Sequence, residues 1–297
     1  MEPAIDALPP PEMARKAEQV GAAKAEMSVA NTFALAVLAG AFIALGAAFA
    51  TTTGTGAAAM PYGVGRLLAG LAFSLGLILV VVAGAELFTG NNLIVMAWAG
   101  RRVSTARLAR NWAIVYAGNF VGAIATAGLV YVGKQYTFDH GEVGAQALAI
   151  ASSKTSLGFV QAIALGALCN ALVCLAVWLT YGARTTADKI LAVIPPIAAF
   201  VAIGFEHSVA NMYFIPYGLF VKANQGFVSS LSPAPDLSNL TWGRFLVDNL
   251  LPVTIGNIVG GALMVGIVYW FIYLRPRVEL TASGGGGSPP RAPERAR

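Results

Sequence analysis

The sequence predicts an all-α polytopic membrane protein with six transmembrane helices, built as a 3+3 inverted repeat in which the second and fifth helices are broken. Its composition predicts the class, because 57% of the 297 residues are hydrophobic and only 11% are charged, unlike ordinary soluble domains. Its pattern predicts the repeat, because polar stretches at residues 84–92 and 204–212 interrupt two long apolar segments. The net charge of +5 does not indicate nucleic-acid binding, since the basic residues lie in short loops and tails.

Six apolar segments are long enough to cross a hydrocarbon core of about 30 Å, which takes roughly 20 helical residues. We expect these segments at residues 29–50, 66–99, 112–132, 157–181, 190–221 and 250–273. Two long polar loops are expected at residues 133–156 and 222–248, and Pro195 and Pro196 are expected to kink the fifth segment. The segments together predict one pore domain over residues 29–274.

The two ends of the chain are expected to lie outside this domain. Residues 1–28 are polar, and the charged, alanine-rich part from Met13 to Met27 is compatible with a short helix at the membrane surface or in the mouth of a pore, or equally with a simple polar leader. No cleavable signal peptide is indicated, because the first apolar run is long enough to remain as an anchor. Residues 275–297 contain a run of four glycines and several prolines, so disorder is expected there.

The positions of the basic residues predict the orientation. Of the 19 lysines and arginines, fourteen lie in the two tails and in the loops after the second and fourth segments, and five lie on the other side. Because cytoplasmic segments are richer in these residues, both termini are expected in the cytoplasm. An even number of spans follows.

The two interruptions share one pattern and form the candidate functional site. Each contains a glycine, a glutamate two positions later and an asparagine five positions after the glutamate: Glu86 and Asn91 in the first, Glu206 and Asn211 in the second. The second also carries His207. Ionisable residues at this depth are costly and occur where they line a cavity or a substrate path, so we expect a transport site between the halves. We expect both glutamates to cap backbone amides at the broken helix ends.

Other residues inside the apolar segments are expected to have packing roles. The small residues at 118–122 and 256–261 fit close contact of the third and sixth segments with their neighbours. Cys169 and Cys174 lie on different faces of one predicted helix, so neither a disulfide nor a metal site is indicated. Asn170 lies at the middle of the same helix.

These motifs together resemble the formate/nitrite transporter family, and within it most nearly the formate channels. The resemblance extends from about residue 11 to residue 274 and rests on the order and spacing of Ala85-Glu86-Leu87-Phe88-Thr89-Gly90-Asn91, Lys154, Cys169 to Trp178, Gly204 to Asn211 and Pro252-Val253-Thr254-Ile255-Gly256-Asn257. It implies an aquaporin-like protomer, five protomers in a ring, and one substrate path through each protomer. It also implies a bacterial cytoplasmic membrane, no cofactor, and a formate-metabolising enzyme as a candidate partner of the amino tail.

The resemblance further implies roles for individual residues. His207 would be the central residue of the pore, with Asn170 beside it and Thr89 on a mobile loop at the first break. Gly90 permits backbone swings, so residues 87–92 are expected to gate the path. Two hydrophobic constrictions would flank His207, formed by Phe73, Leu77, Leu87, Phe88, Val173 and Phe200.

A path of this kind suits a weak acid. A small anion pays a large desolvation cost in an apolar slit, while its protonated acid pays far less. Lys154 is expected to attract the anion into the entrance. With an ordinary pKa of about 6.5, His207 is expected to protonate the anion or to share its proton with it, and to switch the protein to proton-coupled uptake under acid conditions.

Several alternatives stay open at this point. Gly90-Asn91 after Thr89 departs from the small hydroxyl residues of formate channels and leaves nitrite and hydrosulfide as alternative anions. A water or glycerol channel would carry Asn-Pro-Ala motifs at the breaks, and neither break has one. A membrane-embedded metalloenzyme would need ligands spaced as in His-Glu-x-x-His, but the chain has only 2 histidines. No pairing of a nucleophile with a base indicates an enzyme.

Overall fold

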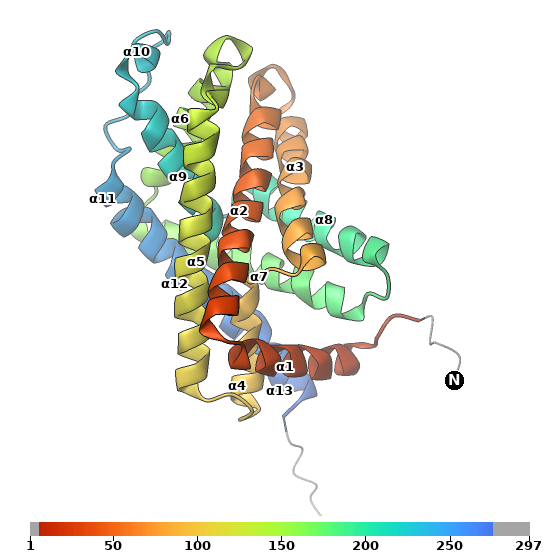
Figure 1. Ribbon diagram of the computed structural model, residues 1–297. Coiled ribbons are helices and arrows are strands. Elements are labelled where there is room, and N and C mark those ends of the chain that lie inside the picture. The colour runs from red at the N-terminus through yellow and green to blue at the C-terminus, as the bar shows by residue number, and fades with distance from the viewer. Residues whose placement is uncertain (1–5, 276–297) are drawn as a thin grey trace, which may run out of the picture.

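The computed structural model describes residues 6–275, and the regular structure within them is helical. The longer helices are α1 (Pro10–Glu26), α2 (Val29–Gly54), α3 (Tyr62–Ala83), α5 (Thr105–Val132), α6 (Glu142–Thr155), α7 (Phe159–Gly182), α8 (Thr186–Ile203) and α9 (Ser208–Ala223). The shorter helices are α4 (Val95–Ala99), α10 (Gln225–Val228), α11 (Trp242–Arg244), α12 (Leu251–Ile258) and α13 (Val268–Tyr273). The last three join through π-helical turns into one continuous helix, Trp242–Tyr273 (Figure 1).

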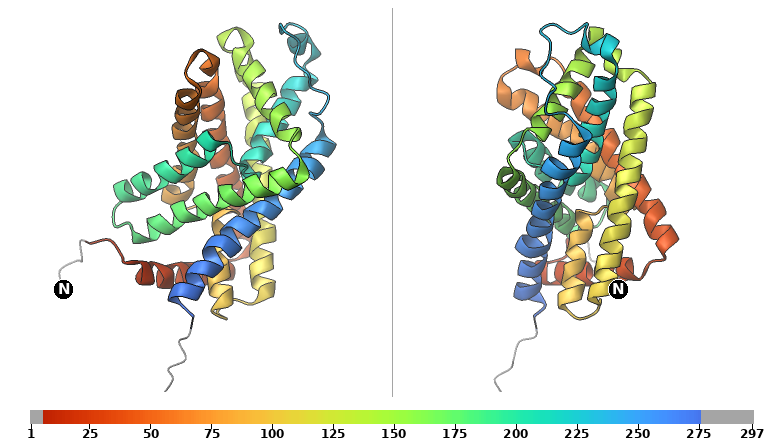
Figure 2. Two further views of the ribbon diagram at one scale, coloured as in Figure 1. Left: turned by 180° about the vertical axis from the view of Figure 1, so that it is seen from behind. Right: turned by 90° about the vertical axis from the view of Figure 1, so that its left-hand side faces the viewer.

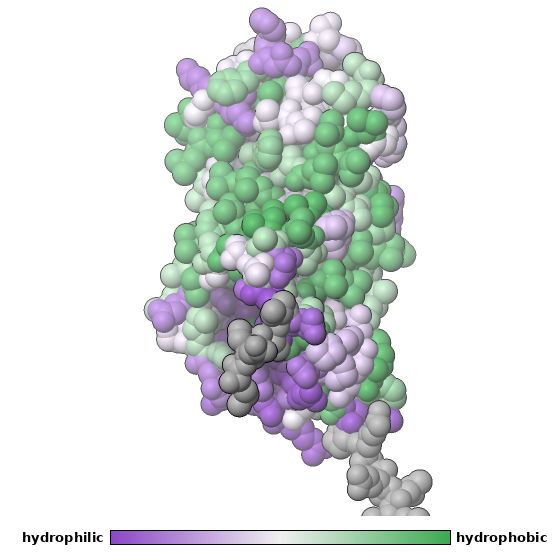
Figure 3. All heavy atoms as spheres, turned by 90° about the vertical axis from the view of Figure 1, so that its right-hand side faces the viewer, coloured by the Kyte–Doolittle hydropathy of each residue, from purple (hydrophilic) through white to green (hydrophobic). Residues whose placement is uncertain are grey.

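Six helices of the described part are long and apolar enough to cross a membrane: α2, α3, α5, α7, α8 and the continuous helix Trp242–Tyr273. Apolar side chains cover the middle of the surface in the view of Figure 3, and polar side chains gather toward the ends. An apolar surface of this extent is covered by lipid or by another membrane subunit. The prediction of an all-α membrane protein with six spans is confirmed.

The helices fall into two halves with the same order. In the first half α1 precedes the long helix α2, which packs against α3 and α5. In the second half α6 precedes the long helix α7, which packs against α8 and α12. Helix α1 lies crosswise at one end of the molecule, beside α4 and α13, whereas α6 lies toward the opposite end (Figures 1 and 2). The two halves therefore run in opposite directions, as an inverted repeat requires.

Glycines allow the long helices of each half to approach closely. A Cβ added at Gly122 of α5 would collide with the carbonyl oxygen of Val37 in α2. A Cβ added at Gly260 of the last span would collide in the same way with the carbonyl oxygen of Ala167 in α7. The expected close packing of the third and sixth spans is confirmed, and it recurs at matching places in the two halves.

The prediction of a long loop at residues 133–156 was wrong, because α6 occupies its second part. Helix α6 has polar ends, which made the segment read as a loop. One face of the helix is nevertheless buried, and it is formed by Val143, Gly144, Ala147, Leu148, Ala151 and Thr155. The loop expected at residues 222–248 is also shorter, since α9 runs to Ala223 and the last span begins at Trp242 rather than at residue 250. The third span begins at Thr105 rather than at residue 112.

Both interruptions of the apolar segments are breaks between helices. Helices α3 and α8 end where Gly84 and Gly204 adopt φ values of 80° and 91°, a region that strongly favours glycine. The chain resumes as the short 3-10 helix Gly90–Ile94 after the first break and as α9 after the second. The predicted breaks are confirmed. The tail expected to be disordered lies outside the described residues from position 276 onward.

Candidate functional site

The second break is closed by hydrogen bonds at both of its ends. At the end of α8, the backbone N–H groups of Gly204 and Phe205 donate to the carbonyl oxygen of Phe200, over 3.1 and 3.0 Å. At the start of α9, His207 is the N-cap, and its Nδ1 accepts from the backbone N–H of Ala210 over 3.0 Å. Only the short run between these caps lacks helical structure, so the position of the imidazole is tightly defined.

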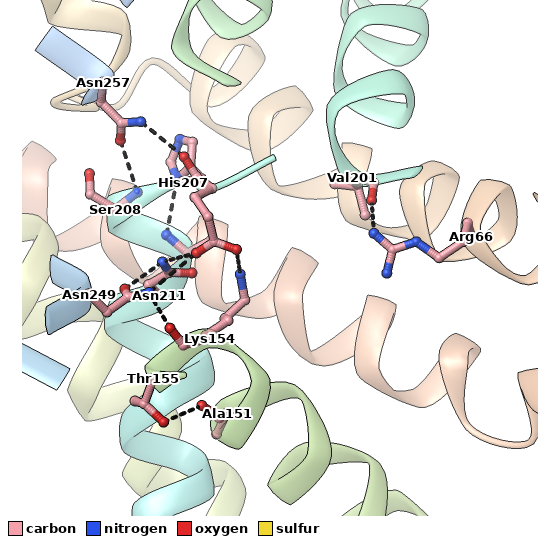
Figure 4. A network of polar contacts seen from close by, with 12 residues as sticks. Arg66, Ala151, Lys154, Thr155, Val201, His207, Ser208, Asn211, Asn249 and Asn257 are labelled. Atoms are coloured by element: carbon pink, nitrogen blue, oxygen red, sulfur yellow. Dashed lines mark hydrogen bonds and ion pairs between the residues drawn. The ribbon is translucent and has the colours of Figure 1, made fainter. Parts of the chain in front are cut away.

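Glu206 is buried at the centre of a polar network in this break. Figure 4 labels its partners Lys154 and Asn211, with Asn249 and Asn257 nearby. One carboxylate oxygen accepts from Nζ of Lys154 in α6 over 2.7 Å, and the other accepts from Nδ2 of Asn211 over 2.7 Å. Nδ2 of Asn211 also donates to Asn249, which in turn donates to the carbonyl oxygen of Lys154. The buried carboxylate is thus paired and hydrogen-bonded on both oxygens, as its burial requires.

Asn257, in α12, holds the backbone on both sides of His207. Its Nδ2 donates to the carbonyl oxygens of Gly166 and Glu206 over 2.9 and 3.0 Å, and its Oδ1 accepts from the backbone N–H of Ser208 over 2.9 Å. One side chain from another span therefore satisfies the irregular backbone that a membrane interior would otherwise leave unpaired.

The first break has an equivalent network, built from residues of the same types at other positions in the chain. Glu86 accepts from Nζ of Lys24 in α1 over 2.8 Å and from Nδ2 of Asn91 over 2.6 Å. Asn91 donates to Asn111, which donates to the carbonyl oxygen of Lys24. Asn119 of α5 donates to the carbonyl oxygen of Glu86, as Asn257 does to that of Glu206. The structure therefore confirms the pairing of the two breaks and extends it to the helices that precede each half.

Sequence reasoning missed five members of these networks: Lys24, Asn111, Asn119, Asn249 and Asn257. A signal for one of them exists. Lys24 lies five residues before Val29, the start of α2, and Lys154 lies five residues before Phe159, the start of α7. The lysines therefore occupy matching places in the two repeats.

His207 joins the two breaks through Thr89. Nε2 of the imidazole and Oγ1 of Thr89 are 3.0 Å apart, and both residues are buried. Nδ1 accepts a hydrogen bond from the backbone N–H of Ala210 and therefore carries no proton. The neutral ring has its proton on Nε2, and this N–H donates a hydrogen bond to Oγ1 of Thr89. The ring of Phe200 stacks beside the imidazole with centroids 5.9 Å apart. The structure thus brings His207, Thr89 and Phe200 together where the two breaks meet.

Asn170 supports the loop of the first break from behind. Its Nδ2 lies within hydrogen-bonding distance of the carbonyl oxygens of Thr89 and Asn257, at 3.3 and 2.7 Å, and of Oδ1 of Asn92 at 2.9 Å. The buried thiol of Cys174 also donates to the carbonyl oxygen of Thr89 over 3.3 Å. Asn170 therefore acts on His207 only through Thr89. It holds the backbone of Thr89, whose hydroxyl contacts the imidazole.

Two cavities lie on either side of this contact. The first, which we call the His207 cavity, is about 600 Å³ and is lined by His207, Glu206, Lys154, Arg66, Phe73 and Phe200 among others. The second, which we call the Lys24 cavity, is about 330 Å³ and is lined by Lys24, Glu86, Leu77, Leu87, Gly90, Asn91, Lys16 and Lys189 among others. Both cavities are therefore lined by charged as well as apolar side chains.

Four of the six residues predicted to form constrictions line one cavity or the other, and two line neither. Phe73 and Phe200 line the His207 cavity and contact each other edge to face, with ring centroids 5.5 Å apart, while Leu77 and Leu87 line the Lys24 cavity. Phe88 lines neither cavity, because its ring packs on Trp112 and Tyr116 of α5. Val173 is buried and also lines neither.

Within residues 6–275, no group of three or more His, Cys, Asp and Glu side chains is placed to hold a metal ion. Cys169 and Cys174 are both buried and free. The acidic residues of the breaks are instead paired with lysines.

Comparison with known proteins decides the family. The family model described as "Formate/nitrite transporter" matches residues 11–271. The chain belongs to the formate/nitrite transporter family. Two relatives in this family are the "Formate channel FocA" of Escherichia coli (strain K12), 46% identical over 274 residues, and that of Haemophilus influenzae, 42% identical over 264 residues. The first match covers 91% of this chain and 96% of the relative, and the second covers 88% and 93%.

Solved structures of the family have the same fold. A structure described as "Pentameric formate channel with formate bound" is 46% identical, has a TM-score of 0.78, and covers 83% of this chain and 98% of its own. A second, described as "FNT family ion channel", is 30% identical, has a TM-score of 0.74, and covers 88% and 98%. As a member of the formate/nitrite transporter family, the chain is a multi-pass membrane transporter and not an enzyme, which sets the metalloenzyme alternative aside.

Proposed function

We propose that this chain is a bidirectional channel for formate and related small monovalent weak-acid anions, in which His207 couples passage to a proton under acid conditions. The position of His207 carries the proposal, because its imidazole lines one cavity and hydrogen-bonds Thr89 of the opposite break. Relatives described as formate channels, and a similar structure described as holding formate, support the choice of anion.

The hydrogen bonds of His207 separate a passive mode from a coupled mode. In the passive mode the neutral ring donates its Nε2 proton in a hydrogen bond to a passing carboxylate, in place of Thr89. In the coupled mode the ring takes a second proton at Nδ1, which must first release the N–H of Ala210. The Nε2 proton then passes to the anion, which leaves as the neutral acid while the ring keeps the proton on Nδ1. Acid favours the second mode because it fills Nδ1.

Replacement of His207 tests this mechanism. His207→Asn keeps a polar group of similar size, so we expect passive export of formate to survive and accumulation driven by a pH gradient to be lost. The measurement is formate accumulation in proteoliposomes with an imposed pH gradient, for wild type and variant. Equal accumulation in both would show that the proton does not travel through His207.

Assembly and orientation form a second part of the proposal. We infer that five chains assemble in a bacterial cytoplasmic membrane, with both termini in the cytoplasm; the excess of basic residues at the α1 end and the described pentamer of a relative support this. Native mass measurement in mild detergent should show five chains. Reporters fused at residues 1 and 297 should both report a cytoplasmic location. A stable monomer would contradict the five-chain assembly, and a reporter outside the cytoplasm would contradict the orientation.

Nitrite and hydrosulfide are the alternative anions, because Gly90 and Asn91 follow Thr89 in the loop that faces the Lys24 cavity. Uptake of formate, nitrite, acetate and hydrosulfide by proteoliposomes at two pH values separates these candidates. The proposal requires formate to pass at least as fast as the others.

We further propose that residues 87–92 gate the path and that α1 controls them. Lys24 of α1 bonds Asn91 of this loop and Glu86 just before it, and a Cβ added at Gly21 of α1 would lie 3.2 Å from Cα of Ile94. Deletion of residues 1–24 removes the partner of Glu86 and should alter flux or its pH dependence. Unchanged flux at both pH values would remove α1 from the mechanism.

A formate-metabolising enzyme is proposed to contact the same tail, which crosslinking from residue 12 would test.

A further inference from the structure

The charges of the His207 cavity are not all compensated in the same way. Its charged lining residues are Arg66, Lys154 and Glu206. Lys154 and Glu206 form an ion pair of 2.7 Å whose side chains are 16% and 6% exposed, so their formal charges cancel inside the wall. Arg66 makes no ion pair with any described residue. The net positive charge of this cavity therefore comes from Arg66.

Arg66 extends from α3 and binds the end of α8 (Figure 4). Its Nε donates to the carbonyl oxygen of Ala202 over 3.0 Å, and its Nη2 donates to that of Val201. These bonds fix the guanidinium beside Gly204, where an added Cβ would lie 3.3 Å from Nη2. A guanidinium has five N–H donors, so three stay available after the two bonds to carbonyls are made. The group is thus rigid, charged and incompletely bonded.

Bonds to carbonyl groups do not neutralise a formal charge. The carboxyl-terminal end of a helix carries roughly half a negative charge, so the end of α8 reduces the field of Arg66 without cancelling it. A fixed charge in a cleft with low-dielectric walls raises the local concentration of small counter-ions and speeds their entry by about 10- to 1,000-fold. Lys154, with Glu206 2.7 Å away, lacks this long-range effect.

We propose that Arg66, rather than Lys154, captures the anion in the His207 cavity and presents it to His207. The planar guanidinium fork matches two oxygens of one planar anion, so the site selects formate and nitrite over hydrosulfide, which offers a single sulfur acceptor. Lys154 has a different task, which is to hold Glu206 and so the irregular backbone of the break. This inference rests on the proposed function, because it assigns the capture step of that channel.

Two variants of Arg66 and one control test the assignment in proteoliposomes of the full chain. Arg66→Gln removes the charge, and Arg66→Lys keeps the charge but loses the planar fork. Lys134→Gln is the control, since Lys134 is an exposed cation in the loop before α6 and lines neither cavity. Uptake of formate and hydrosulfide is measured far below half-saturation, at low salt and at about 1 M salt, where the screening length falls to about 3 Å. Five-chain assembly is checked for each variant.

We expect Arg66→Gln to lower formate permeability about tenfold at low salt and to match Arg66→Lys at high salt, where the charge is screened and both variants lack the planar fork. Arg66→Lys should keep the salt-dependent attraction, with a fall in permeability for formate and none for hydrosulfide. Lys134→Gln should match wild type.

A loss in Arg66→Gln that still exceeds that of Arg66→Lys at high salt would show that Arg66 serves to cap α8 rather than to attract the anion, and unchanged permeability at low salt would exclude it from capture. If Arg66→Gln does not assemble, Arg66→Lys decides, because equal losses for formate and hydrosulfide contradict the fork. Absence of formate uptake by wild type would instead refute the proposed function itself. The two failures are therefore distinguishable.

Discussion

The two helix breaks share a scaffold but differ in the residues that face the path. In both, a glutamate accepts from a lysine and an asparagine, and a second asparagine from a later span holds the backbone. The three residues after each glutamate differ: Leu87, Phe88 and Thr89 in the first break, and His207, Ser208 and Val209 in the second. The repeat has preserved the supporting network, while the chemistry lies in the positions that diverged.

The single polar contact between the breaks shows why divergence was needed. His207 of one half meets Thr89 of the other, and the residues at the matching positions, Leu87 and Val209, are apolar and buried. Two identical breaks would present either two imidazoles or none. One proton site, placed between two cavities, requires the halves to be unequal.

The largest expected effect comes from the glycines that both halves share. Gly122→Ala and Gly260→Ala each place a Cβ against a backbone carbonyl oxygen of the neighbouring long helix, which cannot move aside as a side chain would. We expect either substitution to prevent assembly. Size-exclusion chromatography of the detergent-solubilised protein checks this. Gly128→Ala in the same helix α5 is the matched control, since a Cβ there meets nothing within 4 Å.

A smaller effect is expected from the buried carboxylates. Glu206→Ala leaves Lys154 without a partner at 16% exposure, and a buried pair broken in this way costs about 3 kcal/mol. Glu86→Ala should cost less, because Lys24 is 27% exposed and water can solvate part of its charge. Thermal unfolding midpoints measure the difference, with the exposed Glu142→Gln as control. A larger loss for Glu86→Ala would mean that the two networks are not equivalent supports.

The sequence predicted the helix class, the six spans and both breaks, because these follow from hydrophobic length and from a local Gly–Glu–Asn pattern. Through the family resemblance it also placed His207 and Thr89 in the two breaks, but it did not predict the contact between them. The expectation that both glutamates cap backbone amides was wrong, because their carboxylates accept from lysine and asparagine side chains. The pairing of Lys154 with Glu206 was not predicted, since the two are 52 positions apart and only the fold brings α6 to the break. For the same reason Asn249 was not singled out, and Asn257 was noted only as part of a family motif, without its role in holding the break.

A further effect, confined to transport, concerns Thr89. Thr89→Val keeps the shape of the side chain but leaves the Nε2 proton of His207 without an acceptor in a buried site, which costs about 1–2 kcal/mol. The loop should then leave its position more readily, and formate flux should change by about tenfold or more. Thr89→Ser retains the hydroxyl and should stay near wild type. Equal flux for the valine and serine variants would show that the hydroxyl has no part in holding His207.

The smallest effect is expected at the most exposed ion pair of α1. Glu26 and Arg107 are paired over 3.1 Å, but their side chains are 63% and 53% exposed, so water screens the pair. Exposed pairs contribute less than about 1 kcal/mol, and we expect Glu26→Gln to leave the unfolding midpoint and formate flux unchanged.

Lys24→Gln, two residues earlier on the same helix, removes the partner of the buried Glu86 and should lower both quantities. The contrast isolates burial as the cause, because the two substitutions each remove one charge from one end of α1. If Glu26→Gln lowered flux as much as Lys24→Gln, the docking of α1 as a whole would control the path. The contact of Lys24 with the first break would then have no specific effect on flux.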